Sequence, residues 1–292
     1  MPSTRDIRRR IKSVKNTSQI TKAMQMVAAS KMRKAQQTAL AGRPYATLMN
    51  EVLAEVAAGA GDFSHPLMEL RPGDRRAVVI VSTDKGLCGA LNSNLLREAA
   101  RFDKDKTTYI TAGRKASQFI ARTKRKLGAE FTYKDAPLFS EARAISKFAQ
   151  ELFLKGEVDR VDIVFTNFIS TLNQKPEVRQ FLPLRELKAV DAGIAGDHAE
   201  VELTVGSREF LFEPAPASVL GALLPHYLNY QLYQVLLESK ASEHSARMVA
   251  MKNATDNAKQ IIKDLTLEYN KLRQANITRE LLEITTAQMA LG

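Results

Sequence analysis

The stretch that decides the fold is residues 226–291, HYLNYQLYQVLLESKASEHSARMVAMKNATDNAKQIIKDLTLEYNKLRQANITRELLEITTAQMAL, a run of 66 residues without proline or glycine. A helix of that length would extend on the order of 100 Å at about 1.5 Å per residue. A narrow apolar stripe follows it, formed by Ala254, Ala258, Ile261, Leu265 and Leu272. Because its other faces are polar, this helix cannot be the core of its own domain and must project or pair with another helix. We expect it to begin near Ser218, kink at Pro225 and end near Met289.

A second stretch without proline or glycine, Ser3–Ala41, is the available partner. Ser3 or Thr4 is placed to cap its amino end. Apolar residues recur along it at helical spacing, namely Ile7, Ile11, Val14, Met24, Ala28, Met32 and Ala35. Gly42-Arg43-Pro44 should end or kink this helix, and a second helical piece should run to about Ala58. Because a domain's length of chain separates the two long helices, we expect them to form an antiparallel coiled coil.

The middle of the chain alternates β-branched runs with helical patterns, which indicates an inserted Rossmann-like α/β domain with a parallel sheet. Strands are predicted at 75–82, 107–111, 130–133, 161–168 and 178–183, and helices at 91–102, 114–127 and 140–155. A hairpin is predicted over 200–212. The fold class is therefore α/β plus coiled coil, with domains at 1–60, 61–215 and 216–292.

Charge is distributed unevenly along the chain. Of the net charge of +11, a net +10 falls in residues 1–45, which contain eleven Lys or Arg and one acid, Asp6. Such a segment suits an acidic partner, whether nucleic acid, anionic lipid or acidic protein, unless it is only a solvated helix face. No apolar run approaches the roughly 18–20 residues that span a bilayer. The amino terminus also lacks the apolar region of a secretory signal.

The segment Ser82–Gly89, STDKGLCG, follows the first strong strand and precedes a helix, where a doubly wound sheet places a phosphate loop. Its Gly86 and Gly89 match neither GxGxxG nor a Walker loop, so a tight strand-to-helix turn is the other interpretation. Cys88 is either a nucleophile or a buried structural thiol, and Asp84 either a metal ligand or a turn former. HExxH and GxSxG do not occur in the sequence. We therefore predict no catalytic residue, no cofactor and no metal site.

Four ordered blocks resemble the gamma subunit of F-type ATP synthases, and the resemblance extends over essentially the full length. The blocks are Ile20–Met24 with Ser30–Met32, Ser82–Gly89, Ala241–His244 with Arg247–Lys252, and Arg273–Leu281. One departure occurs at the extreme carboxyl-terminal tip, where Ala287-Gln288 stands in place of the family's Gly-Ala pair. The departure concerns contacts of the tip and not the resemblance as a whole.

The resemblance implies a central rotor shaft with no catalytic residues of its own. Its terminal helices would form an asymmetric coiled coil inside a ring of three alpha and three beta subunits, and its α/β domain would touch the epsilon subunit and the c-subunit ring. Proton-driven rotation of the c ring would turn this single shaft and couple rotation to ATP synthesis or hydrolysis at the beta subunits. The shaft would thereby regulate ATPase activity and proton flow. Its implied place is peripheral, at the cytoplasmic face of the bacterial inner membrane, with no nucleic acid bound.

The resemblance also implies roles for residues of the carboxyl-terminal helix. Arg273 and Gln274 match a pair that holds a catch loop of a beta subunit. Arg247, Thr278 and Glu280 match positions that are needed for coupling.

Three further contacts are implied elsewhere in the chain. Met24 would face an acidic lever segment of a beta subunit, and Lys22 would belong to the same patch. Glu213 would lie near the loops of the c ring. The net positive charge of residues 1–45 is suited to such an acidic lever. A partly polar long helix is suited to a shaft that must rotate without binding tightly to its surroundings.

Two other functions stay open from the residues alone. A coiled-coil nucleic-acid-binding protein would use the basic amino-terminal helix, although that helix has no aromatic residue before Tyr45. It predicts binding that weakens steeply with salt. A nucleotide-dependent α/β enzyme would use Ser82–Gly89 and predicts ATP or dinucleotide binding by the isolated chain.

Overall fold

The computed structural model describes residues 3–59, 64–184, 213 and 215–291. The chain divides into two compact units, of which the larger is Ala28–Arg247 and the smaller is Met1–Val27 together with Met248–Gly292. Domain boundaries after residues 60 and 215 stay a prediction. The predicted hairpin over 200–212 lies outside the described residues.

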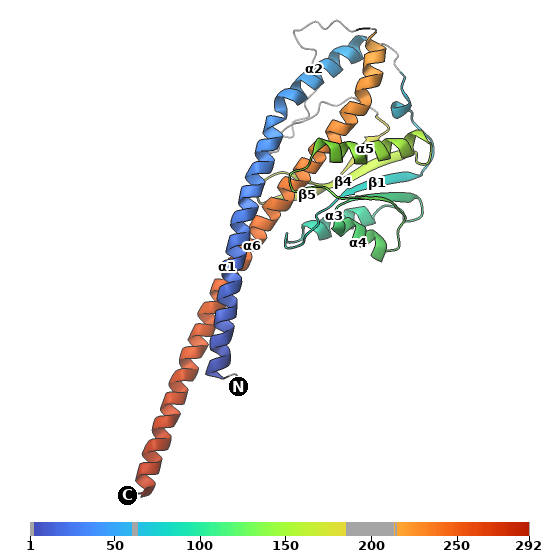
Figure 1. Ribbon diagram of the computed structural model, residues 1–292. Helices are drawn as coiled ribbons and strands as arrows, with labels where there is room; N and C mark the ends of the chain where they lie inside the picture. The colour runs from blue at the N-terminus through green and yellow to red at the C-terminus, as the bar shows by residue number, and fades with distance from the viewer. Residues whose placement is uncertain (1–2, 60–63, 185–212, 214, 292) are drawn as a thin grey trace. The chain divides into compact units, whose positions relative to one another are not determined.

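The larger unit contains a five-stranded sheet with the order β3-β2-β1-β4-β5 (Figure 1). Its strands are β1 (Arg76–Val81), β2 (Thr107–Ala112), β3 (Leu127–Phe131), β4 (Arg160–Phe168) and β5 (Gln174–Leu182). Strands β1 to β4 are parallel, as predicted. In contrast to the all-parallel prediction, β5 runs antiparallel to β4. The connection over 169–173 is too short for the crossover that a parallel strand requires.

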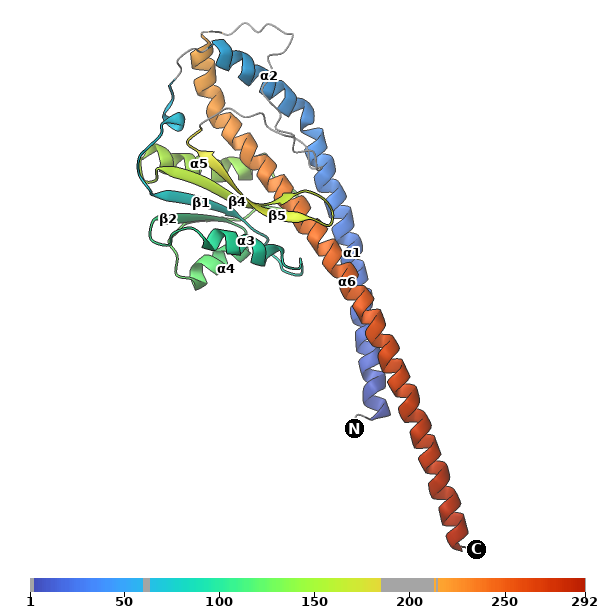
Figure 2. The ribbon, with the colours of Figure 1, turned by 180° about the vertical axis from the view of Figure 1, so that it is seen from behind.

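Both faces of β1 are buried, which explains its continuous β-branched sequence. Val78 and Ile80 pack against helices α3 and α4, whereas Val79 faces α5 and α6. Figures 1 and 2 show α3 and α4 on one side of the sheet and α5 on the other. Each such buried side chain contributes about 1.5–3 kcal/mol to folding. The helices are α3 (Leu91–Ala100), α4 (Arg114–Arg122) and α5 (Phe139–Leu154).

The boundaries around β3 differ from the prediction. Helix α4 ends at Arg122 and not at 127, because Lys124 has a φ of 53° and leaves the right-handed helical region. The strand begins at Leu127, three residues before the predicted start. The helical pattern continues across this turn because no glycine or proline marks it before Gly128.

The remaining helical elements come from the two ends of the chain. They are α1 (Thr4–Ala41), α2 (Arg43–Gly59), the short 3-10 helix Pro66–Met68 and α6 (Pro216–Leu291). Gly42 separates α1 from α2, as predicted. Helix α6 begins at a proline, whose missing N–H is harmless in the first turn, and it continues as helix through Pro225. None of the described helices has a segment long and apolar enough to cross a membrane.

In the larger unit, α1 and α2 lie antiparallel to α6, which confirms the predicted pairing. Residue numbers rise along α1 and α2 while those of their partners on α6 fall. Ala39 lies in one core cluster with Leu237, Gly42 bonds Tyr230, and Tyr45 bonds His226. The Tyr230 hydroxyl donates to the Gly42 carbonyl at 3.1 Å. A Cβ on Gly42 would lie 3.1 Å from that same hydroxyl, so glycine permits the close approach.

In the smaller unit, buried and partly buried residues recur at alternating spacings of four and three on both helices. They lie at 7, 11, 14, 18, 21 and 25 of α1, and at 251, 255, 258, 262, 265, 269 and 272 of α6. This is the pattern of a coiled-coil seam. Ile262 occupies the seam, whereas Ile261, which the apolar stripe predicts there, is 47% exposed. The amino end of α1 is capped by Ser3, whose Oγ accepts from the Asp6 N–H at 3.2 Å.

One seam position of the smaller unit is a polar pair. The hydroxyls of Thr21 and Thr255 lie 2.7 Å apart, and Thr255 also donates to the Met251 carbonyl at 2.8 Å. Thr21→Val should lower the free energy of unfolding by about 1 kcal/mol, because the Thr255 hydroxyl loses a partner in a buried seam. The double variant with Thr255→Val should cost less than the two single changes together, as thermal unfolding followed by helical circular dichroism would measure. Strictly additive losses would show that the pair does not interact.

Candidate functional site

Two of the sequence blocks meet at the carboxyl edge of the sheet, namely Ser82–Gly89 and the block that contains Ala241–His244 and Arg247. The first lies in the β1–α3 loop (residues 82–90), which must leave the sheet at this edge because β1 ends at Val81. The second lies on α6, where residues 234–245 are all buried although many are polar. Polar groups buried to this extent need partners within the protein.

Five charged side chains of alternating sign connect these segments, in the order Lys31, Asp135, Lys240, Glu243, Arg247. We name them the ion-pair chain. Lys240 Nζ lies 3.7 Å from Asp135 Oδ1 and 2.9 Å from Glu243 Oε2. Arg247 Nη2 lies 2.8 Å from Glu243 Oε1. The side chains of Lys240 and Glu243 are 1% and 4% exposed, so each buried charge has an opposite charge beside it.

Arg247 also binds the backbone of the β1–α3 loop. Its Nη2 donates to the carbonyl oxygens of Lys85 at 3.3 Å and Gly86 at 3.2 Å. The loop is a tight turn in which Leu87 and Gly89 have φ values of 62° and 60°. A phosphate loop turns N–H groups toward its ligand, whereas this loop turns two carbonyls toward a guanidinium. The geometry therefore favours the interpretation as a strand-to-helix turn.

Cys88 and Tyr133 complete the interior of this region. The Cys88 thiol is 2% exposed and accepts from Asn92 Nδ2 at 3.3 Å. Burial raises the pKa of this thiol, which favours a structural thiol over a nucleophile. Tyr133 donates its hydroxyl to the Ser82 carbonyl at 3.0 Å, and Lys240 Nζ lies 4.5 Å from the centre of its ring. No three potential ligands among the described His, Cys, Asp and Glu residues are grouped to hold a metal.

His244 is the one histidine of the buried segment 234–245. It is 2% exposed, and neither ring nitrogen has a hydrogen-bond partner among the residues that the structure describes. Burial lowers the pKa of His244 to about 4. Four charged groups surround it, namely Glu243, Lys240 and Arg247 from α6 and Asp135 from the β3–α5 connection. The ring is therefore neutral at pH 7.

This lowered pKa makes folding stability depend on pH. Below pH 6.5 the unfolded chain takes up a proton on His244 before the folded chain does. The histidine's contribution is thus fully present above pH 6.5 and is lost as the pH falls toward about 4. His244→Gln should reduce the loss of unfolding free energy over this range by about 3 kcal/mol, measured by urea unfolding at several pH values. Identical pH profiles for both proteins would contradict this assignment.

The residues singled out by resemblance on the last part of α6 are solvent-exposed. Arg273, Gln274, Thr278 and Glu280 all lie on the exposed surface, and the Thr278 hydroxyl donates to the Gln274 carbonyl at 2.9 Å. On α1, Lys22 is exposed and Met24 is partly buried.

Glu213 is exposed, three residues before the start of α6. It lines a groove of about 540 Å³ together with Ser218, Val219, Ala222, Leu223 and His226. Its lining is half apolar, with Val219, Ala222 and Leu223, and its polar residues are Glu213, Ser218 and His226.

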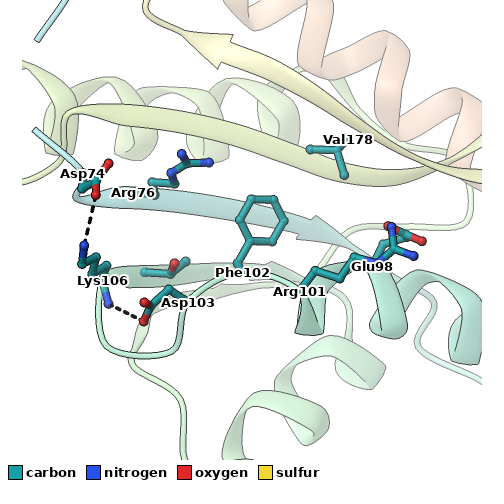
Figure 3. A pocket seen from close by; sticks show the side chains of 9 residues that line it. Asp74, Arg76, Glu98, Arg101, Phe102, Asp103, Lys106 and Val178 are labelled. Atoms are coloured by element: carbon teal, nitrogen blue, oxygen red, sulfur yellow. Dashed lines mark hydrogen bonds and ion pairs between the residues drawn. The ribbon is translucent and has the colours of Figure 1, made fainter. Parts of the chain in front are cut away.

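A second cavity, of about 480 Å³, lies at the amino edge of the sheet (Figure 3). Charged side chains surround the Phe102 ring there, and most of them have an opposite charge nearby. Lys106 bonds Asp74 at 3.0 Å, and Arg101 bonds Glu98 at 2.8 Å. This compensation leaves little net charge to select a ligand.

Only part of the ion-pair chain is predictable from the sequence. Arg247 was a candidate from the resemblance, but Lys31, Asp135, Lys240 and Glu243 were not. The charged residues of α6 do not indicate burial, because an exposed helix has similar residues. The available hint was the placement of Lys240 and Glu243 among Leu236, Leu237 and Ala241, which are apolar residues of a core-facing helix.

Comparison with known proteins agrees with this architecture. A family model described as ATP synthase matches residues 3–291. The ATP synthase gamma chain of Opitutus terrae is 50% identical over 292 residues, covering 99% of this chain and 99% of that protein. A chain of the Tetrahymena thermophila mitochondrial ATP synthase central stalk and c ring is 26% identical, with a TM-score of 0.57 over 80% of this chain and 99% of that one.

A chain of the Euglena gracilis mitochondrial ATP synthase has the same fold. Its TM-score is 0.70 at 22% identity, over 99% of this chain and 94% of that chain. The family model matches nearly all residues, and the Opitutus terrae relative matches over the full length. The chain therefore belongs to the ATP synthase gamma chain family.

Proposed function

We propose that this chain is the central rotor shaft of an F-type ATP synthase. The observation that carries the proposal is the carboxyl-terminal third of α6, whose apolar side chains are exposed around the helix. Leu281, Leu282 and Ile284 are 58%, 60% and 62% exposed. At about 100° per residue they point in different directions, and a helix that is apolar on several faces is normally enclosed. A surrounding ring of alpha and beta subunits would enclose it.

The named residues acquire roles within that ring. Arg273 and Gln274 would hold a loop of one beta subunit, and Thr278 and Glu280 would contribute to coupling nearby. Their exposure on α6 supports this assignment. Because the seam of the smaller unit is narrow, most of the surface of its two helices is free for such contacts. The shaft would make different contacts with each conformation of the beta subunits, and these differences would give the three beta subunits different nucleotide affinities.

One shaft would serve three alpha and three beta subunits, as a peripheral component at the cytoplasmic face of a bacterial inner membrane.

The α/β domain would contact the epsilon subunit and the c ring, with Glu213 beside the c-ring loops. The exposed position of Glu213 in the lining of the groove supports a contact there. Nucleotide chemistry would take place on the beta subunits.

Reconstitution tests the proposed function. The purified chain, mixed with alpha and beta subunits of its own complex, should co-elute with three of each and raise their ATPase rate. A chain that neither co-elutes nor changes that rate would not be the shaft. The nucleic-acid alternative predicts salt-sensitive DNA binding by the chain instead.

Met24→Lys tests the proposed contact with an acidic lever. The added cation should over-stabilise one rotary state, so that fewer protons are pumped per ATP hydrolysed in membrane vesicles. Ala23→Lys is the matched control, since it adds the same charge about 100° around the helix at an exposed position. Equal pumping by the wild type and Met24→Lys would count against this placement of Met24.

A further inference from the structure

Arg247 makes its contacts within its own chain. Its side chain is only 12% exposed. Its donors bind one carboxylate, on Glu243, and two backbone carbonyls, on Lys85 and Gly86. A residue that reached out to another subunit would keep its guanidinium available at the surface, whereas this guanidinium is directed at the β1–α3 loop.

The ion-pair chain joins four segments that are distant in sequence. Lys31 comes from α1, Asp135 from the β3–α5 connection, and Lys240 and Glu243 from α6. Arg247 extends the connection to the β1–α3 loop. Within the larger unit, the carboxyl edge of the sheet is thereby tied to both long helices by charge-assisted hydrogen bonds, which are the shorter and stronger kind.

Buried ion pairs contribute little net stability but fix geometry when every charge is satisfied. Because positive and negative charges alternate along the ion-pair chain, removing its last residue, Arg247, leaves the other charges paired. Without Arg247, Glu243 still has Lys240 at 2.9 Å from its Oε2, so its charge stays paired, whereas its Oε1 and the two carbonyls of the loop lose the guanidinium. The most direct consequence of removing Arg247 is therefore a loosened β1–α3 loop in a folded protein.

We infer that the ion-pair chain is a clamp between the α/β domain and α6, and that Arg247 is a positioning residue for coupling that acts through the β1–α3 loop and not by touching a beta subunit. This inference rests on the proposed function. A rotor must pass torque between its globular domain and its helices, and a guanidinium fork bound to two carbonyls and one carboxylate resists displacement in more than one direction.

The test uses the whole complex reconstituted with Arg247→Met, with Arg247→Lys, and with Arg143→Met, which removes an exposed arginine of α5 as the control. Amide hydrogen exchange over residues 82–90 and proton pumping per ATP hydrolysed are measured on the same preparations. Arg247→Met should accelerate exchange in the loop about ten- to a hundredfold and lower pumping per ATP. Arg247→Lys keeps the charge but loses the guanidinium fork, so its exchange rate and its pumping per ATP should lie between those of the wild type and Arg247→Met. Arg143→Met should match the wild type in both measurements.

Two results would overturn the inference. Lowered pumping with unchanged exchange in the loop would mean that Arg247 acts on another subunit directly. Faster exchange with unchanged pumping would mean that the loop lies off the path of coupling. If Arg247→Met does not assemble, the same two criteria apply to Arg247→Lys. Failure of the wild-type complex to assemble or pump would instead refute the proposed function.

Discussion

Gly113→Ala should lower the free energy of unfolding by about 3–5 kcal/mol, combining backbone strain with overpacking. Gly113 joins β2 to α4 with a φ of 104°, a conformation that L residues rarely adopt. A Cβ there would lie 2.3 Å from the Ser82 carbonyl oxygen and 2.9 Å from its carbon. That carbonyl cannot easily move, because it accepts from Tyr133 and its residue also pairs with Ala112.

Gly156→Ala is the matched control. Gly156 has a φ of 72°, but a Cβ added there would have no other atom within 4 Å. The substitution should cost only about 1 kcal/mol, which is the strain of the backbone conformation alone. Guanidinium unfolding followed by the near-ultraviolet signal of the buried tyrosines would compare the two. Equal losses of unfolding free energy in Gly113→Ala and Gly156→Ala would show that the added Cβ fits beside Ser82 without strain.

Glu243→Gln should cost about 3 kcal/mol of unfolding free energy, because it leaves Lys240 and Arg247 buried without the carboxylate between them. Asp135 still lies 3.7 Å from Lys240 and limits the loss. Glu151→Gln is the control, since its pair with Lys147 is exposed and long, at 3.9 Å. The control should change stability by less than about 0.5 kcal/mol. A comparable effect of both substitutions would contradict the account in which Lys240 and Glu243 form a buried pair.

The long helices were predictable from the sequence because their signal is simple. Between His226 and Leu291 nothing interrupts a helix, and α6 spans Pro216–Leu291. The strands β1 and β4 were predictable for a similar reason, since they are β-branched runs between turn residues. The direction of β5 was not, because direction depends on the length of its connection as well as on its own residues.

The site was less predictable because it depends on contacts between distant segments. The resemblance singled out both Ser82–Gly89 and Arg247, but no pattern in the sequence says that a guanidinium on α6 binds the carbonyls of Lys85 and Gly86. Asp135 lies in a connection with ordinary surface composition, yet it links Lys31 to Lys240. The seam shows the same limit on a smaller scale, since Ile261 and Ile262 are indistinguishable by composition and only one is in the interface.

Rotation of this chain inside its complex tests the central claim most directly. Lys104→Cys places one reactive thiol on an exposed turn of the α/β domain, and the native Cys88 is too buried to compete for the label. With the alpha and beta subunits fixed to a surface and a probe on residue 104, added ATP should turn the probe continuously in one direction. ATP hydrolysis at the full rate with a stationary probe would contradict the assignment of this chain as the shaft.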